Sequence, residues 1–126
     1  MPLVRISLRR GKSPQYIAAI RDAVYEAMTG VFAVPVKDRF ILVHQHDAEE
    51  FDYDPEYLGI QRTDDLVIIQ ITANNTRTVE QKKAFYARLV ELLTQKPGLR
   101  PEDVFIGLVE VAKENWSFGH GIGQYI

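Results

Sequence analysis

Three residues of this chain, Pro2, Asp38 and Arg77, carry groups whose chemistry could be combined in one site. Initiator methionine is normally removed when the next residue is small, so we expect the mature chain to begin with the secondary amine of Pro2. Such an amine is a base near neutral pH, and it can also form an iminium with a carbonyl compound, as catalytic lysines do. Many proteins start Met-Pro by chance, so this feature alone is only a hypothesis.

Arg77 lies between a predicted strand and a predicted helix, directly before Thr78. A guanidinium there can hold a carboxylate with two parallel hydrogen bonds, a geometry that a lysine does not match. The alternative is an exposed arginine on a loop. Without a catalytic role for Pro2, that alternative is the better interpretation.

Asp38 stands at the start of a predicted strand, after a turn. The segment Asp38-Arg39-Phe40-Ile41 matches Asp103-Val104-Phe105-Ile106, and each follows a helix, a turn and a proline. Because Asp103 occupies the same place in the second half, a turn-stabilising role for Asp38 is about as well supported as a catalytic one.

The histidines give a weaker signal. His44 and His46 are two apart on a predicted strand, so they share a face and could ligate a metal. No third ligand is placed by the sequence, and we favour an ordinary sheet or interface role and no metal.

Aromatic residues and glycines gather near the C-terminus. Trp116 and Phe118 precede the glycine-rich segment 119–123. The aromatics either seal the core or form the wall of a pocket from which water is excluded. The glycines follow no strand-to-helix pattern of a phosphate loop, so they predict a turn that lets the C-terminus fold back.

The first half of the chain predicts a β-α-β unit. A strand is expected over 3–8, where apolar residues alternate with polar ones. Ser13-Pro14 is a helix-start signal, and the helix is expected to run to about Met28 and to end at Gly30. Residues 39–46 are predicted to form the second strand.

The second half repeats this plan. A strand is expected over 66–72, and the capping-box pattern from Thr78 to Gln81 opens a helix that stops at Lys96-Pro97-Gly98. A strand over 103–111 follows. We therefore predict an α/β (α+β) fold, in which two β-α-β repeats form a four-stranded sheet with two helices on one face. The uncovered face, expected to be apolar, predicts oligomerisation.

The length of 126 residues predicts one domain, with repeat one at 2–46, repeat two at 66–111 and a C-terminal tail at 112–126. The connection at 47–65 contains eight acids and one arginine. It is predicted to be a solvated linker, with a role at a subunit contact or a site entrance as the second choice.

Composition excludes several functional classes. With 15 Lys+Arg against 17 Asp+Glu and the basic residues scattered, we expect neither nucleic-acid nor membrane binding. The absence of cysteine excludes disulfides, thiolate catalysis and Cys-ligated metal. No apolar run approaches the ~20 residues of a membrane helix. We expect a soluble, cytoplasmic protein.

The chain as a whole resembles the tautomerase superfamily, whose members use an N-terminal proline, and within it the malonate semialdehyde decarboxylase family. The likeness spans nearly the whole chain. It is carried by Pro2-Leu3, Val34-Pro35 with Asp38-Arg39, Val43-His44-Gln45-His46, Arg62-Thr63-Asp64, Glu80-Gln81-Lys82, Ala84-Phe85-Tyr86-Ala87, Asp103-Val104 and Trp116-Ser117-Phe118-Gly119.

This resemblance implies a tautomerase-like fold, a homotrimer, and Pro2 as the catalytic amine with Asp38 as its acidic partner. It also implies an apolar wall made by Trp116, Phe118 and Tyr125.

In one place the chain departs from the family pattern of two arginines, one residue apart, after the third strand. Here only Arg77 can be carried over, and it would hold the substrate carboxylate. Asn74 and Asn75 bring hydrogen-bond donors to the substrate but no charge.

The function that follows is decarboxylation of malonate semialdehyde or a similar small 3-oxo acid, without metal or organic cofactor. One alternative is another proline-dependent reaction, either keto-enol tautomerisation or hydration and dehalogenation of 3-haloacrylates. The other is a non-enzymatic oligomeric module in which Pro2 is inert.

Overall fold

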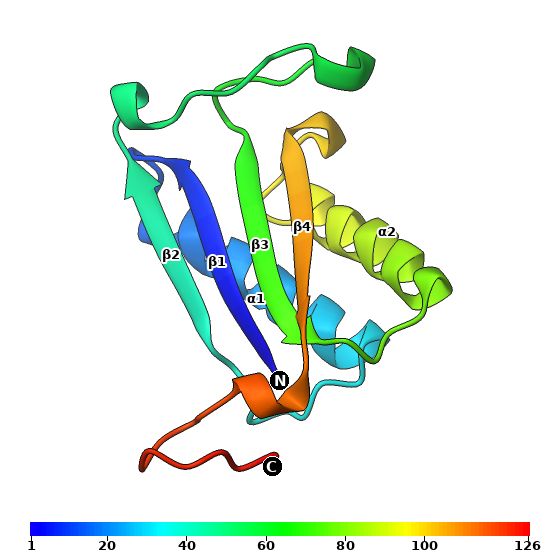
Figure 1. The fold of residues 1–126 in the computed structure, drawn as a ribbon. Helices are drawn as coiled ribbons and strands as arrows, with labels where there is room; N and C mark the ends of the chain where they lie inside the picture. The colour runs from blue at the N-terminus through cyan, green and yellow to red at the C-terminus, as the bar shows by residue number, and fades with distance from the viewer.

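The two halves of the chain form matching β-α-β units in the computed structural model, which describes residues 1–126 (Figure 1). The first unit contains β1 (Pro2–Arg9), α1 (Pro14–Val31) and β2 (Ile41–His46), and the second contains β3 (Val67–Asn74), α2 (Val79–Gln95) and β4 (Val104–Val111). In each unit the two strands pair in parallel. The units join through antiparallel pairing of β1 with β3, which gives the strand order β2-β1-β3-β4.

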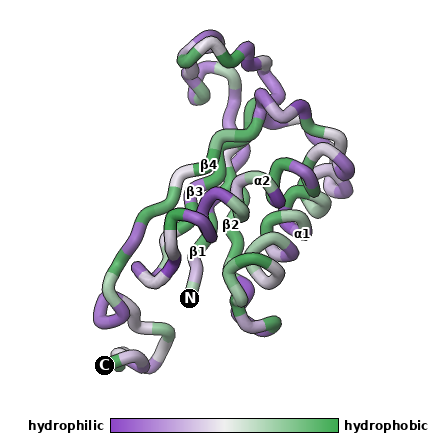
Figure 2. The backbone as a smooth tube through the Cα atoms, turned by 90° about the vertical axis from the view of Figure 1, so that its right-hand side faces the viewer, coloured by the Kyte–Doolittle hydropathy of each residue, from purple (hydrophilic) through white to green (hydrophobic).

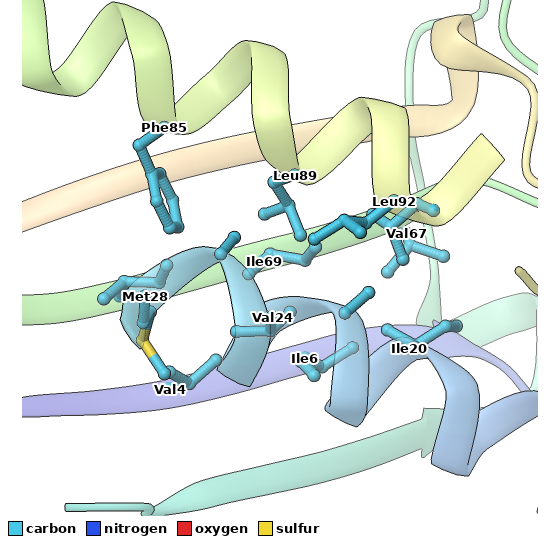
Figure 3. Packing of buried hydrophobic residues seen from close by; sticks show 14 of the residues in the cluster. Val4, Ile6, Ile20, Val24, Met28, Val67, Ile69, Phe85, Leu89 and Leu92 are labelled. Atoms are coloured by element: carbon cyan, nitrogen blue, oxygen red, sulfur yellow. The ribbon is translucent and has the colours of Figure 1, made fainter. Parts of the chain in front are cut away.

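Both helices cover the same face of this sheet, as the turned view in Figure 2 shows. This confirms the prediction of a four-stranded sheet with two helices on one face. The core lies between the layers (Figure 3), where Ile6 and Ile69 of the sheet meet Val24 of α1 and Leu89 of α2. Each is at most 1% exposed, and burial of such a side chain stabilises the fold by about 1.5–3 kcal/mol.

Both helices begin at the capping residues that the sequence predicts. The Ser13 side chain accepts a hydrogen bond from the backbone N–H of Tyr16, and Pro14 is the first helical residue. At α2, Thr78 and Gln81 each accept a hydrogen bond from the other's backbone N–H, which is the predicted capping box. Capping satisfies amides that have no partner within the helix.

Several predicted bounds were wrong by one to three residues. β1 is one residue longer at each end than the predicted 3–8, and β3 covers 67–74 instead of 66–72. α1 continues through Gly30 to Val31, because Gly30 keeps a negative φ and the chain leaves the helix only at Phe32. β2 begins at Ile41 instead of residue 39. β4 begins at Val104, since Asp103 belongs to a short 3-10 turn.

The uncovered face of the sheet is mixed, which corrects the expectation of an apolar surface. At its centre Arg5 and His44 contact each other, with 3.3 Å between Nη1 and Nε2. Exposed apolar side chains lie on the two outer strands, with Leu42 on β2 and Phe105 and Val109 on β4. Polar side chains at the centre of this face are found in subunit interfaces as well as on solvent-exposed surfaces.

The acidic segment 47–65 crosses the end of the sheet opposite the N-terminus (Figure 1). It is fastened there by Thr63, whose backbone N–H and hydroxyl both donate to the buried carboxylate of Asp103. The segment therefore does not border the entrance of a site near the first residues of its own chain. Neither helix is both long and apolar enough to cross a membrane.

Candidate active site

Four segments meet at one end of the sheet. Because β1 and β2 run antiparallel to β3 and β4, the starts of the first pair lie beside the ends of the second pair. The N-terminus, the turn before β2, the β3–α2 connection and the start of the C-terminal tail are thus brought together (Figure 1). These segments and the adjoining end of β3 carry the predicted site residues, apart from Tyr125 near the end of the tail.

The terminal amine and Asp38 form the centre of this arrangement. The amine nitrogen of Met1 lies 3.7 Å from Oδ2 of Asp38, and the two side chains are only 7% and 13% exposed. Oδ1 of Asp38 is buried and has no hydrogen-bond partner. A buried carboxylate oxygen without a partner is costly, so it marks a place where a ligand or a mobile proton could bind.

The environment shifts the protonation of this amine. Burial lowers the pKa of the Met1 amine below its ordinary value of 8.0. Asp38 raises this pKa, while the positive charges of Arg77 and Lys113 lower it further. The net shift of this pKa is downward, so the site favours the unprotonated amine more than solvent does.

Pro2 follows directly as the first residue of β1. It is buried and pairs with Ala73 across the antiparallel strands. The strand therefore holds whatever atoms precede Leu3 in a fixed place beside the Asp38 carboxylate.

Arg77 is a half-buried side chain, which argues against an ordinary exposed loop arginine. Its Nη2 donates a hydrogen bond to the backbone oxygen of Phe32 at 3.1 Å, and its Cζ lies 5.1 Å from the centroid of the Phe32 ring. Burial lowers the pKa of Arg77, while Asp38 and Glu110 raise it. The guanidinium is thereby oriented at the same end of the sheet as Asp38.

The aromatic residues of the tail stack on one another. Trp116 and Phe118 are stacked with centroids 5.7 Å apart, and Phe118 meets Tyr125 edge-on at 4.9 Å. The tail folds back as predicted, because the Gln124 side chain accepts from the backbone N–H of Phe118 and donates to the oxygen of Gly119.

The two predicted site asparagines, Asn74 and Asn75, differ in burial and in hydrogen bonding. Asn74 is 7% exposed, and its Oδ1 accepts a 2.8 Å hydrogen bond from Nε1 of Trp116. Asn74 therefore anchors the aromatic wall. Asn75 is exposed, and its backbone N–H donates to the oxygen of Val111. Contact of either side chain with a substrate stays a prediction.

A cavity of about 350 Å³ opens beside the amine. Of the predicted site residues, Asp38, Phe118 and Tyr125 line it, whereas Pro2, Arg77, Trp116 and both asparagines do not. Sequence reasoning missed four lining residues, Met1, Pro35, Lys37 and Phe40. The full lining is Met1, Pro35, Lys37, Asp38, Phe40, Phe118 and Tyr125. Three of the missed residues flank Asp38 within 35–40, and that proximity was the signal that could have found them.

Asp38 and its counterpart Asp103 have different surroundings despite their matching sequence. Asp103 is fully buried and accepts two hydrogen bonds from Thr63, at 2.7 and 2.6 Å. No donor from the protein hydrogen-bonds the Asp38 carboxylate in this way. The turn-stabilising role suggested by the repeat therefore belongs to Asp103.

The predicted histidine pair is not brought together with other ligands. His44 contacts Arg5, and the His46 ring is tilted against Phe51 with centroids 5.7 Å apart. No group of three or more His, Asp or Glu side chains is arranged to hold a metal ion.

Comparison with known sequences identifies the family. Residues 38–119 and residues 2–60 match two sequence families that are both described as "Tautomerase enzyme". The chain belongs to the tautomerase family. It is 40% identical to "Probable tautomerase YusQ" of Bacillus subtilis (strain 168), over all of this chain and 99% of that protein. It is 32% identical to "Probable tautomerase YrdN" of the same organism, over all of this chain and 97% of that protein.

Solved structures agree with this tautomerase fold. Malonate semialdehyde decarboxylase, whose crystal structures address decarboxylase and hydratase activities, is 33% identical with a TM-score of 0.91, over 98% of this chain and 95% of that one. FG41 malonate semialdehyde decarboxylase inhibited by 3-bromopropiolate is 38% identical with a TM-score of 0.91, over 98% of this chain and 93% of that one. A fused 4-OT symmetric trimer, 18% identical with a TM-score of 0.79 over 96% and 94%, shares the fold.

Proposed function

We propose that this tautomerase-family chain, after removal of Met1, uses the free amine of Pro2 to decarboxylate malonate semialdehyde or a similar small 3-oxo acid. The observation that carries the proposal is the terminal amine, 3.7 Å from a carboxylate whose other oxygen is buried without a partner, at a cavity. The likeness to two malonate semialdehyde decarboxylases supports the substrate class.

Removal of Met1 would change the site in two ways. It turns the Pro2 nitrogen from an amide into a secondary amine, which can hold a proton or form an iminium. It also takes away a side chain that is only 7% exposed beside Asp38, so the cavity would extend toward Pro2.

The reaction needs a place for the electron pair of the broken bond. When the bond between the carboxylate carbon and C2 breaks, carbon dioxide leaves and the pair moves into a new C2–C3 double bond. A protonated Pro2 hydrogen-bonded to the aldehyde oxygen would stabilise the resulting enolate. Alternatively, an iminium between Pro2 and C3, formed with loss of water, would take up the pair as an enamine. Protonation of C2 turns the enolate into acetaldehyde. In the second route it turns the enamine into an iminium, which water hydrolyses to acetaldehyde and the free amine of Pro2.

The surrounding residues have separate roles in this proposal. Arg77 holds the departing carboxylate, and the apolar wall that contains Phe118 and Tyr125 favours its departure as neutral gas. Asp38 orients the amine or activates water. No organic cofactor takes part in the proposed steps, and we propose residues 1–126 as one functional domain that acts as a homotrimer.

A second candidate is keto-enol tautomerisation with Pro2 as the base. Burial lowers the pKa of the terminal amine in this environment, which favours the unprotonated form that a base requires. The two relatives described as probable tautomerases also support this reaction. Hydration and dehalogenation of 3-haloacrylates is a third use of the same amine.

Substrate assays separate these reactions. Purified protein that starts at Pro2 is incubated with malonate semialdehyde, the enol of phenylpyruvate, and 3-chloroacrylate, and the products are followed by NMR. We expect acetaldehyde from malonate semialdehyde at the highest kcat/KM, with loss of activity in Pro2→Ala. Faster turnover of the enol would assign the tautomerase reaction. Inactivity on all three substrates would favour the oligomeric module.

A further inference from the structure

Lys37 is the one cationic side chain among the seven residues that line the cavity. Arg77 does not line it and donates one hydrogen bond to Phe32. Lys37 is therefore the positive side chain that a ligand in this cavity would contact.

The ammonium group of Lys37 is also free to bind a ligand. Two other lysines form ion pairs, Lys12 with Asp65 and Lys82 with Glu110. Lys37 is exposed and forms none, and the neighbouring Asp38 carboxylate faces the terminal amine. A lysine is a flexible point charge with three donors, so it can follow an anion from solvent into a cavity.

The charges around the cavity favour an anion. The terminal amine and Lys37 line it, and Arg77 and Lys113 lie close enough to act on the amine. Asp38 is the one acid that lines it. A cleft with a surplus of one sign attracts ligands of the other sign and raises their local concentration.

We propose that Lys37 is a substrate-binding residue that attracts the carboxylate of the substrate into the cavity. This inference rests on the proposed function, because it places the substrate carboxylate in this cavity. Because this inference assigns Lys37 to binding, we expect removal of its charge to raise KM and to leave kcat unchanged.

The kinetic test compares an acid with its uncharged ester. Ketonisation of the enol of phenylpyruvate and of its methyl ester is measured for wild type, Lys37→Gln and Lys37→Arg. The matched control is Lys83→Gln, because Lys83 on α2 is also exposed and without an ion pair. We expect Lys37→Gln to raise KM for the acid roughly 3- to 5-fold, the strength of an exposed ion pair, with kcat within 2-fold. Lys37→Arg should restore KM, and KM for the ester should not change.

A binding measurement keeps the two proposals apart. Trp116 is the only tryptophan and stacks on Phe118 of the cavity, so its fluorescence reports occupancy. Malonate should bind Lys37→Gln roughly 3- to 5-fold more weakly than wild type, while malonamide should bind both alike. Lys37-dependent malonate binding without turnover would refute the proposed function and uphold this inference. Equal behaviour of Lys37→Gln and Lys83→Gln, or an equal effect on acid and ester, would overturn it.

Discussion

At the scale of single residues, two aspartates with the same sequence context have opposite surroundings. Asp103 accepts two hydrogen bonds from Thr63, while one oxygen of Asp38 has no partner and the other faces the terminal amine. Hydrogen bonds to a buried carboxylate stabilise a fold, whereas a buried carboxylate oxygen without a hydrogen-bond partner lowers the free energy of unfolding. The pair therefore gives a matched test of structural and catalytic roles.

For Asp38→Asn we expect a loss of activity without a loss of stability. Asparagine keeps the shape of the side chain but removes the negative charge that orients the amine or accepts its proton. Groups with such a role contribute on the order of 10²- to 10⁴-fold to the rate. The melting temperature should stay within about 3 °C, because no protein donor is lost. Steady-state kinetics and thermal unfolding of the same sample check both parts; unfolding at a much lower temperature would instead support a turn role.

For Asp103→Asn we expect the reverse. The amide group presents N–H donors where Thr63 already donates, so one buried contact becomes repulsive, and the cost is about 2 kcal/mol. Urea unfolding at a fixed protein concentration measures this loss. Activity per folded molecule should remain close to that of wild type, since Asp103 lies at the other end of the sheet from the cavity.

The pH dependence of the rate depends on the pKa of the catalytic amine. Burial lowers the pKa of the Met1 amine from 8.0, and we expect the same cause to lower that of the Pro2 amine after processing. A reaction that uses the protonated amine should lose rate as the pH rises through this lowered pKa, and one that uses it as a base should gain rate there. The profile of kcat/KM against pH for malonate semialdehyde should show the fall; a rise would assign the base role to Pro2.

At the scale of elements, the tail is tied to the sheet through one polar contact. Nε1 of Trp116 donates to Asn74 at the end of β3, and this bond fixes the stacked pair that Trp116 forms with Phe118. The wall of the cavity is therefore positioned by a strand end and not by the tail alone.

We expect Trp116→Phe to loosen this wall. The ring stacking is kept, but Oδ1 of Asn74, which is 7% exposed, loses its donor, at a cost of about 1–3 kcal/mol. The expected result is a lower melting temperature and a raised KM. A double-mutant cycle with Asn74→Leu should give a coupling energy of about 1 kcal/mol. Additive effects of the two changes would show that the contact does not position the wall.

The elements themselves were largely predictable, because their signals are local. The Ser13 cap and the capping box at Thr78 were read from neighbouring residues, and both form as expected. Gly30 misled because a glycine ends a helix only where the backbone takes a positive φ, and here it does not. The hydrogen bond between Asn74 and Trp116 joins segments far apart in sequence, which local patterns do not contain, whereas Lys37 is the sequence neighbour of Asp38 and could have been found from that proximity.

At the scale of the whole molecule, the sheet has one face that no helix covers. Exposed Phe105 and Val109 on β4 and Leu42 on β2 lie on this face around a polar centre. Apolar side chains beside a polar patch are typical of subunit interfaces, which are no more apolar on average than other surfaces.

We expect light scattering at micromolar concentration to return three times the subunit mass of 14.4 kDa. Phe105→Asp should shift the protein toward the monomer, because it places a charge on an exposed apolar position of the open face. Lys83→Asp on α2 is the control and should leave the mass unchanged. A monomer mass for wild type would contradict the trimer.

The central claim, that the amine of Pro2 performs the chemistry, is tested most directly by one comparison. Intact mass identifies preparations that start at Pro2 and preparations that retain Met1, and the rate of acetaldehyde formation from malonate semialdehyde is measured for both. We predict that the form that starts at Pro2 is active and that the form that retains Met1 is at least ~100-fold slower, because an amide nitrogen neither holds the proton nor forms an iminium. Full activity in the form that retains Met1 would contradict every proline mechanism proposed for this chain.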